Sequence, residues 1–385
     1  MVSRKLFFVI AGICIFFLSA CGPKAVAPEA EFDTPAHHVK NGHKLLKSGK
    51  IDAAFREFNR AKELDPKHSP AYVGLGLVQG VKGEFDNGFK AMKKAQRYAD
   101  GKEQKVAVNV GYMRLYIMGG EKVKKNWLQE VTTRFNNAIG YIPDLPEPYF
   151  YMGVAYKNSY KFQKAGANFT KVLELDKGLV AEADKEYAIV QKIQRAMPGS
   201  VVGKKIALLE KITRADAAAL FIEELEIDTL FKKRTPKKYD TAFQDPTKKF
   251  AAGEYVKTPP ATDIENHVLK ADIDAVIAIG IKGLQPGPDH TFQPEKIITR
   301  AEFAMMIEDI LIKITGDNGL ATKFIGNASP FPDLRADLPF FNAAMVCTTR
   351  NILETKDVAT GEFAPMEPVA GAEALLSIRA LKTQL

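Results

Sequence analysis

The sequence Asp289-His290-Thr291-Phe292-Gln293-Pro294 is followed closely by Ile298-Thr299-Arg300-Ala301-Glu302-Phe303, and these two runs decide the predicted fold. The first run follows Gly287 and Pro288 and is typical of a turn. Thr299 and Glu302 have the spacing of a reciprocal capping box, which predicts the start of a helix. Apolar residues then recur at helical spacing and predict one buried face: Phe303, Met306, Ile307 and Ile310.

The same pattern occurs on both sides of this stretch. Residues 212–216 read Ile-Thr-Arg-Ala-Asp, residues 361–365 read Gly-Glu-Phe-Ala-Pro, and residues 369–374 read Val-Ala-Gly-Ala-Glu-Ala. Ile281 stands eleven residues before Phe292, as Ile352 stands eleven before Phe363. The recurrence predicts three related copies of one unit.

These residues resemble the S-layer homology (SLH) family, whose repeats have an Asp-containing start, a first helix ending in Gly-Ile, a D-G-x-F-x-P turn and an I-T-R-A-E helix start. The middle copy, 263–315, matches best, although Val268 occupies the family's tryptophan position. The first copy, about 186–228, lacks a clear aromatic-Pro turn. The third, about 330–383, has Ala370 and Gly371 where the family has Thr and Arg.

The resemblance implies that three packed repeats bind cell-wall glycan or peptidoglycan non-covalently. Each motif arginine would face an acidic sugar group, because a guanidinium at a helix N-terminus suits a carboxylate. The predicted glycan-binding residues are Arg214, Arg300, Asp289 and Glu302. The alternative is that Thr299 and Glu302 are a helix cap and the arginines are solvated first-turn residues.

A second repeat, with a period of 34 residues, precedes these copies. Gly42, Ala54, Phe58 and Ala61 are followed by Gly76, Gly88, Met92 and Ala95, and another copy begins near Pro146. A period of 34 with small residues at fixed positions resembles the tetratricopeptide repeat (TPR), a solenoid of helix hairpins. Four copies are predicted, and the third is lengthened by about eight residues between Met118 and Lys125.

Such a solenoid offers a groove for a peptide or a partner helix. The candidate groove residues are Asn41, Lys44, Tyr72, Gln79, Tyr149 and Asn158. The alternative for the tyrosines is that they are packing residues. The expected partner is an unidentified envelope protein.

The first residues have the layout of a bacterial secretory signal, with Arg4 and Lys5 before an apolar run that is too short to span a bilayer. The sequence Leu18-Ser19-Ala20-Cys21 resembles a lipobox, which implies a diacylglyceryl (palmitate-bearing) Cys21 that anchors the chain in a membrane. Gly22 follows instead of aspartate, which favours the outer membrane, facing the periplasm. The alternative is an ordinary signal peptide.

The composition is that of a globular protein, with 46% hydrophobic and 26% charged residues and a formal net charge of +8. The positive balance suits acidic glycan or phospholipid headgroups, and nucleic acid is not an expected partner of an exported lipoprotein. Cys14 lies in the expected signal peptide and Cys21 is expected to carry lipid, so Cys347 has no cysteine to pair with. No disulfide framework is therefore predicted, and Cys347 is expected to be a buried, inert thiol. The sequence has no enzymatic or metal-binding motif, and no cofactor is predicted.

The predicted organisation is all-α, a TPR helix-hairpin solenoid followed by a predominantly helical SLH module. Its segments are a signal peptide (1–20), a tether (21–34), the solenoid (35–179), a capping helix with the first SLH copy (180–232), a basic linker or inserted loop (233–262), and the second (263–316) and third (330–385) copies. We expect a non-catalytic envelope lipoprotein that links a protein to the wall. The alternative is an assembly factor for a pilus or secretion machine whose SLH copies are structural.

Overall fold

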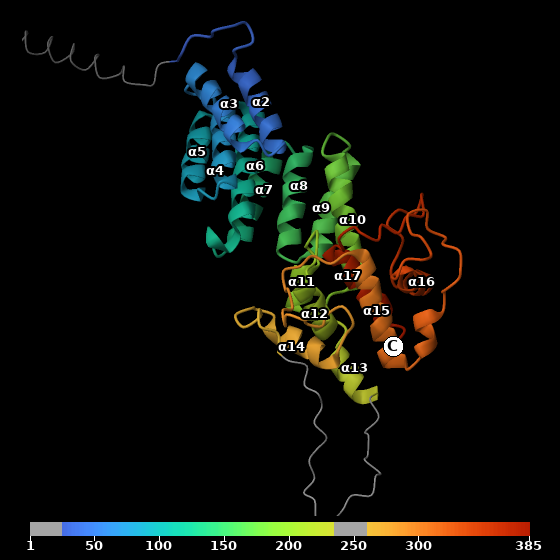
Figure 1. Ribbon diagram of the computed structural model, residues 1–385. Helices are drawn as coiled ribbons and strands as arrows, with labels where there is room; N and C mark the ends of the chain where they lie inside the picture. The colour runs from blue at the N-terminus through green and yellow to red at the C-terminus, as the bar shows by residue number, and fades with distance from the viewer. Residues whose placement is uncertain (1–24, 235–259) are drawn as a thin grey trace, which may run out of the picture. The chain divides into compact units, whose positions relative to one another are not determined.

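Every regular element in the described residues is a helix, as the sequence predicts. The computed structural model describes residues 25–234 and 260–385 (Figure 1). Within these ranges strand-like pairing is limited to isolated bridges, which confirms the all-α class. None of the described helices is long and apolar enough to cross a membrane.

The chain divides into two compact units. We call them the repeat unit, which reaches to Tyr187, and the module, Ala188–Leu385. The division falls inside helix α10 (Val180–Ala196). The signal peptide, Cys21 and most of the basic segment 233–262 lie outside the described residues.

The repeat unit is a row of helix hairpins, visible as neighbouring helices in Figure 1. Its α-helices before α10 are α2 (Pro35–Lys47), α3 (Ile51–Leu64), α4 (Ser69–Val81), α5 (Phe85–Tyr98), α6 (Gly101–Gly119), α7 (Trp127–Tyr141), α8 (Pro146–Asn158) and α9 (Phe162–Leu175). The 34-residue period places a glycine of one helix under a large side chain of the next. A Cβ on Gly42 would lie 2.6 Å from the Phe58 ring, and one on Gly153 would lie 2.6 Å from the Phe169 ring.

The lengthened third copy differs in its first helix. Helix α6 has 19 residues, whereas α4 and α8 have 13 each. It ends at Gly119, and a short 3-10 helix η2 (Gly120–Lys122) follows, beginning at Gly120, whose φ of 52° favours glycine. The extra residues therefore lengthen the first helix of this hairpin and add a 3-10 turn before α7 (Trp127–Tyr141).

The segment before α2, predicted as part of a tether, contacts the first hairpin. Val26 N–H donates to the carbonyl oxygen of Glu63 at 2.8 Å. Asp33 pairs with Arg60 on α3, and His38 lies between Asp33 (2.7 Å) and Glu57 (2.8 Å). Residues 25–34 are thus held by backbone bonding and by a charged cluster.

The module is built from shorter helices joined by turns. They are α11 (Val201–Ile206), α12 (Arg214–Glu223), α13 (Ile227–Arg234), α14 (Lys270–Ile279), α15 (Arg300–Thr315), the 3-10 helix η3 (Asn318–Thr322), α16 (Phe341–Thr349) and α17 (Gly371–Lys382). Figure 1 shows them in yellow-green to red. The three predicted helix starts are the N-termini of α12, α15 and α17.

A closed ring of backbone hydrogen bonds joins these three helix starts. Ile212 N–H donates to Val369 O (2.9 Å), Val369 N–H to Ile298 O (3.2 Å), and Ile298 N–H to Ile212 O (3.1 Å). All three side chains are buried, with exposed fractions of 0 to 1%. The three equivalent positions therefore meet at one point in the core.

The start of the third motif helix differs from the other two in its cap and in its backbone contacts. Thr213 and Thr299 form complete capping boxes with Asp216 and Glu302, as predicted for Thr299. Ala370 provides no side-chain cap. Gly371 N–H donates to Leu209 O at 2.9 Å, and a Cβ at this position would collide with the backbone of Ile206. The close approach of the first copy requires glycine here.

Candidate functional site

Arg300 is the most deeply buried charged residue of the module, with an exposed fraction of 0%. Its Nε donates to Phe363 O and its Nη2 to Glu354 O, both at 2.6 Å. Nη1 pairs with Glu373, and the guanidinium stacks 4.9 Å from the centre of the Phe363 ring. Burial lowers the pKa of Arg300 to about 10, so the side chain remains cationic at neutral pH.

Arg214 occupies the equivalent place one copy earlier. Its Nε donates to Phe292 O (2.7 Å), its Nη2 to Gln285 O (3.0 Å) and its Nη1 to Gly283 O. The guanidinium lies 4.7 Å from the centre of the Phe292 ring. Each motif arginine thus holds the aromatic turn of the next copy.

These contacts show that Arg300 does not face a sugar carboxylate, whereas a glycan contact of the half-buried Arg214 stays a prediction. Every nitrogen of the two guanidinium groups has a protein partner, and Arg300 has no exposed surface. The solvated alternative is also wrong for Arg300. A buried first-turn arginine is hard to distinguish from an exposed one by sequence, because its partners lie more than fifty residues away.

Two aspartates hold the aromatic turns through hydrogen bonds to their backbone N–H groups. The carboxylate of Asp263 accepts from the N–H groups of Phe292 and Gln293, both at 2.7 Å. Asp333 accepts from the corresponding groups of Phe363 (2.9 Å) and Ala364 (2.6 Å). The signal for this role is the spacing of 29 and 30 residues between aspartate and aromatic residue.

The other two predicted glycan-binding residues make local bonds. Asp289 accepts from the N–H of Thr291 (3.1 Å) and from its hydroxyl (2.9 Å), and these bonds lower the pKa of Asp289. Glu302 accepts from Thr299 N–H at 2.8 Å and from Lys296 Nζ at 2.9 Å. Asp289 is exposed, whereas Glu302 is part of the capping box at the N-terminus of α15.

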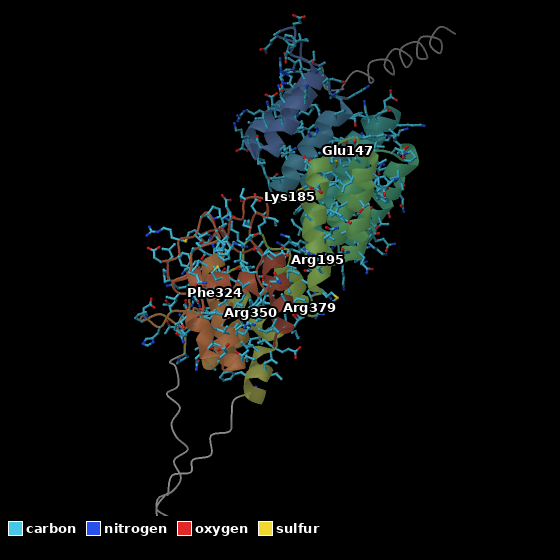
Figure 2. All side chains as sticks on the ribbon, turned by 90° about the vertical axis from the view of Figure 1, so that its right-hand side faces the viewer. Glu147, Lys185, Arg195, Phe324, Arg350 and Arg379 are labelled. Carbon is cyan, nitrogen blue, oxygen red and sulfur yellow. The ribbon has the colours of Figure 1, made fainter. Side chains whose placement is uncertain are left out.

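A cavity of about 280 Å³ lies between α10, α17 and the loop after α16. Three cations line it: Lys192 and Arg195 from α10 and Lys356 from the loop. Figure 2 labels Arg195 on α10. The acids of its wall are Glu354 and Glu373, and Glu373 is already paired with Arg300. Helix α10 was predicted only as a cap of the solenoid, and its two cations were not among the predicted site residues.

Two of the six candidate groove residues of the repeat unit line one cavity. Tyr72 and Gln79 line a shared cavity between α3, α4 and α5. Tyr72 also packs, with its hydroxyl donating to Pro66 O at 2.8 Å.

The other four candidates lie on α2 and α8 and do not line that cavity. Asn41 bonds His37 at 2.9 Å, Lys44 and Asn158 are exposed, and Tyr149 lies edge-on to Phe135.

No cluster of three or more metal-binding side chains occurs among the described residues. Cys347 is fully buried, as expected, and burial raises the pKa of its thiol far above the usual range. Its sulfur contacts Ala304 O at 3.6 Å. A thiol with this environment is an inert part of the core.

Comparisons with known proteins give similarities in two parts of the chain. Among solved structures, the chain is similar to one described as "Crystal structure of YrrB: a TPR protein with an unusual peptide-binding site", with 19% identity over 43% of this chain and 79% of that chain and a TM-score of 0.26. A search of curated proteins gives no match. The family model "S-layer homology domain" matches residues 284–304, which contain the Phe292 turn and the start of α15.

Proposed function

We propose that this protein is a non-catalytic envelope scaffold whose module binds an acidic cell-wall polymer and whose repeat unit binds another protein. The S-layer homology match at 284–304 supports attachment to the envelope, and the helix-hairpin repeat supports protein binding. In this proposal Cys21 carries lipid and holds the chain at the outer membrane, facing the periplasm.

The observation that carries polymer binding is the cationic cavity beside α17. Lys192, Arg195 and Lys356 line it. Lys356 pairs with Glu367 at 3.0 Å and the lining Glu373 pairs with Arg300, which leaves Lys192 and Arg195 against Glu354 alone. The remaining charge is positive, which suits carboxylate or phosphate groups of a wall polymer. The polymer would therefore bind next to the motif helix of the third copy and not at the motif arginines.

Cosedimentation of the full-length, detergent-solubilised protein with purified cell walls tests this site. Lys192→Glu together with Arg195→Glu should abolish cosedimentation with walls that retain their acidic polymer. Lys185→Glu, on the same helix but outside the cavity (Figure 2), is the control and should bind like the parent. Equal binding by all variants would remove the cavity from the proposal.

The lipid anchor is tested separately. Cys21→Ser should release the protein from membranes in detergent partitioning, because acyl chains contribute about 0.8 kcal/mol per buried CH₂. Partitioning that does not change would contradict lipidation at Cys21.

A second function is favoured by the contacts of Arg214 and Arg300. Because both arginines join neighbouring copies, the three copies have a purely structural use as a rigid support. In that case the protein is an assembly factor for an outer-membrane pilus or secretion machine. Wall binding that is absent for the parent protein would favour this function.

A further inference from the structure

A groove of about 300 Å³ lies on the repeat unit between α3 and α5. Helix α4 forms its floor, since Tyr72 and Leu75 are only 7% exposed. The walls come from α3 and α5, which belong to successive hairpins. The groove is therefore created by the stacking of two repeats and does not exist in one.

The charge of this groove is entirely positive. Lys62 on α3 and Lys90 and Lys94 on α5 line it, and no Asp or Glu does. In the described part of the chain none of these three lysines pairs with a carboxylate. Other lysines of the repeat unit are paired, such as Lys82 with Asp52 (2.7 Å) and Lys124 with Glu130 (2.6 Å). Lys62 donates to the neutral side chain of Asn59 at 2.7 Å, and Lys94 lies 5.8 Å from the centre of the Tyr72 ring. Neither contact neutralises the charge of the lysine.

The floor also contains an acceptor without a partner. The Oε1 atom of Gln79 is buried and makes no hydrogen bond. A buried acceptor without a donor destabilises the folded state, and a backbone N–H of a ligand would satisfy it. Beside it, Phe55 and Leu75 give the groove an apolar surface.

We propose that this groove binds an acidic peptide segment of a partner protein. The carboxylates of the peptide pair with Lys62, Lys90 and Lys94, one of its backbone N–H groups donates to Gln79 Oε1, and an apolar side chain contacts Phe55 and Leu75. A headgroup surface fits less well, because the acceptor and the apolar floor lie inside a hollow. The inference rests on the proposed protein-binding role of the repeat unit.

Fluorescence anisotropy of the full-length protein with a labelled, glutamate-rich peptide containing leucine tests the inference. The triple change Lys62→Glu, Lys90→Glu and Lys94→Glu should weaken binding by about tenfold or more, because it removes three ion pairs and adds repulsion between the new carboxylates and the peptide. Binding by the parent should weaken as salt rises. Lys93→Glu, on α5 outside the groove, is the control and should bind like the parent.

Two further measurements separate a specific groove from general attraction. The triple variant should bind a lysine-rich peptide of the same pattern better than the parent does. Gln79→Leu should weaken acidic-peptide binding to a similar extent at low and high salt, because it removes a neutral acceptor.

Three outcomes would overturn the inference. They are equal peptide binding by the parent and the triple variant, an equal loss in the Lys93→Glu control, and lysine-dependent binding of anionic phospholipid vesicles without binding of the peptide. None of them affects polymer binding by the module, which cosedimentation measures independently.

Discussion

The two units are both built from repeats, but they join their repeats by different means. In the repeat unit the joints are steric: Met92, with no exposed surface, fills the space above Gly76 and Gly111. In the module the joints are polar, with a ring of backbone hydrogen bonds and two arginines that reach into the next copy. A steric joint depends on volume, whereas a polar joint depends on every partner being satisfied.

This difference predicts that the module is most vulnerable at Arg300. Arg300→Ala should lower the free energy of unfolding of the module by about 3 to 5 kcal/mol, because it removes the fully buried guanidinium and leaves Glu373, Phe363 O and Glu354 O without this donor. Hydrogen exchange resolved along the chain measures the effect in α15 and α17. Arg335→Ala, which removes an exposed pair with Asp337, is the control and should change little. A loss below about 1 kcal/mol would contradict a polar joint.

The corresponding change in the repeat unit removes volume. Met92→Ala should cost about 2 to 5 kcal/mol, because it leaves a cavity between two helix hairpins. Trp127, the single tryptophan, lies on α7, so its fluorescence during urea unfolding reports this unit. Lys93→Ala is the exposed control and should stay within about 0.5 kcal/mol. If exchange in α15 accelerates as much as in α4, the two units do not unfold separately.

The two arginines of the module should differ. Arg214 is half-buried, so water can replace part of what it donates to Phe292, Gln285 and Gly283. Arg214→Ala should therefore cost about 1 to 3 kcal/mol, less than Arg300→Ala. Urea unfolding followed by exchange in α14 measures it. An equal or larger loss at Arg214 would show that burial does not set the strength of the joint.

The helix caps should contribute less to the stability of the module than either arginine does. Thr213→Ala and Thr299→Ala each remove a capping box and should cost about 1 kcal/mol. Thermal unfolding of the full-length protein measures both. Thr360→Ala, in an exposed loop, is the matched control. If neither cap substitution lowers the unfolding temperature more than Thr360→Ala does, the ring of backbone hydrogen bonds alone fixes the helix starts.

The same contrast explains what the sequence predicts and what it does not. Gly42 and Phe58 recur at fixed spacing because the contact is local in each hairpin, so the period reveals the packing. The capping boxes are also local, and the pair of Thr299 and Glu302 was predictable from its spacing of three residues. Arg300 and Glu373 meet only after the copies assemble, and their spacing of 73 residues carries no local signal.

The cationic cavity of the module was missed for the same reason. Lys192 and Arg195 resemble the solvated face of a helix when read in sequence. They line a cavity only because α17 and Lys356 lie opposite. Gln79, by contrast, was predicted as a groove residue from its place in a repeat, and it lines the groove between α3 and α5.

The smallest expected effect concerns pH, and it should appear in the repeat unit. Burial pushes the pKa of His38 down, but its bonds to Glu57 and Asp33 outweigh burial and raise it. The Arg60 guanidinium, with Glu29 N–H and His38, holds the pKa of Asp33 well below its usual range. A histidine whose pKa is raised in the folded state stabilises that state below about pH 6.5, and the stabilisation is lost as pH rises through the folded-state pKa. An aspartate whose pKa is lowered in the folded state stabilises that state above about pH 3.9, and the stabilisation is lost as pH falls through the folded-state pKa.

Attachment of residues 25–34 to α3 should therefore be strongest between about pH 4 and pH 6.5 and weaken on both sides. Hydrogen exchange of Val26 N–H, which donates to Glu63 O, measures the attachment directly. His38→Gln should flatten the alkaline side of the profile, and Asp33→Asn the acid side. The joint at Arg300 should not respond in this range, since the pKa of Arg300 is about 10. A profile that is flat for the parent, or equal in α15 and in the 25–34 segment, would show that the charged cluster around His38 does not hold this segment.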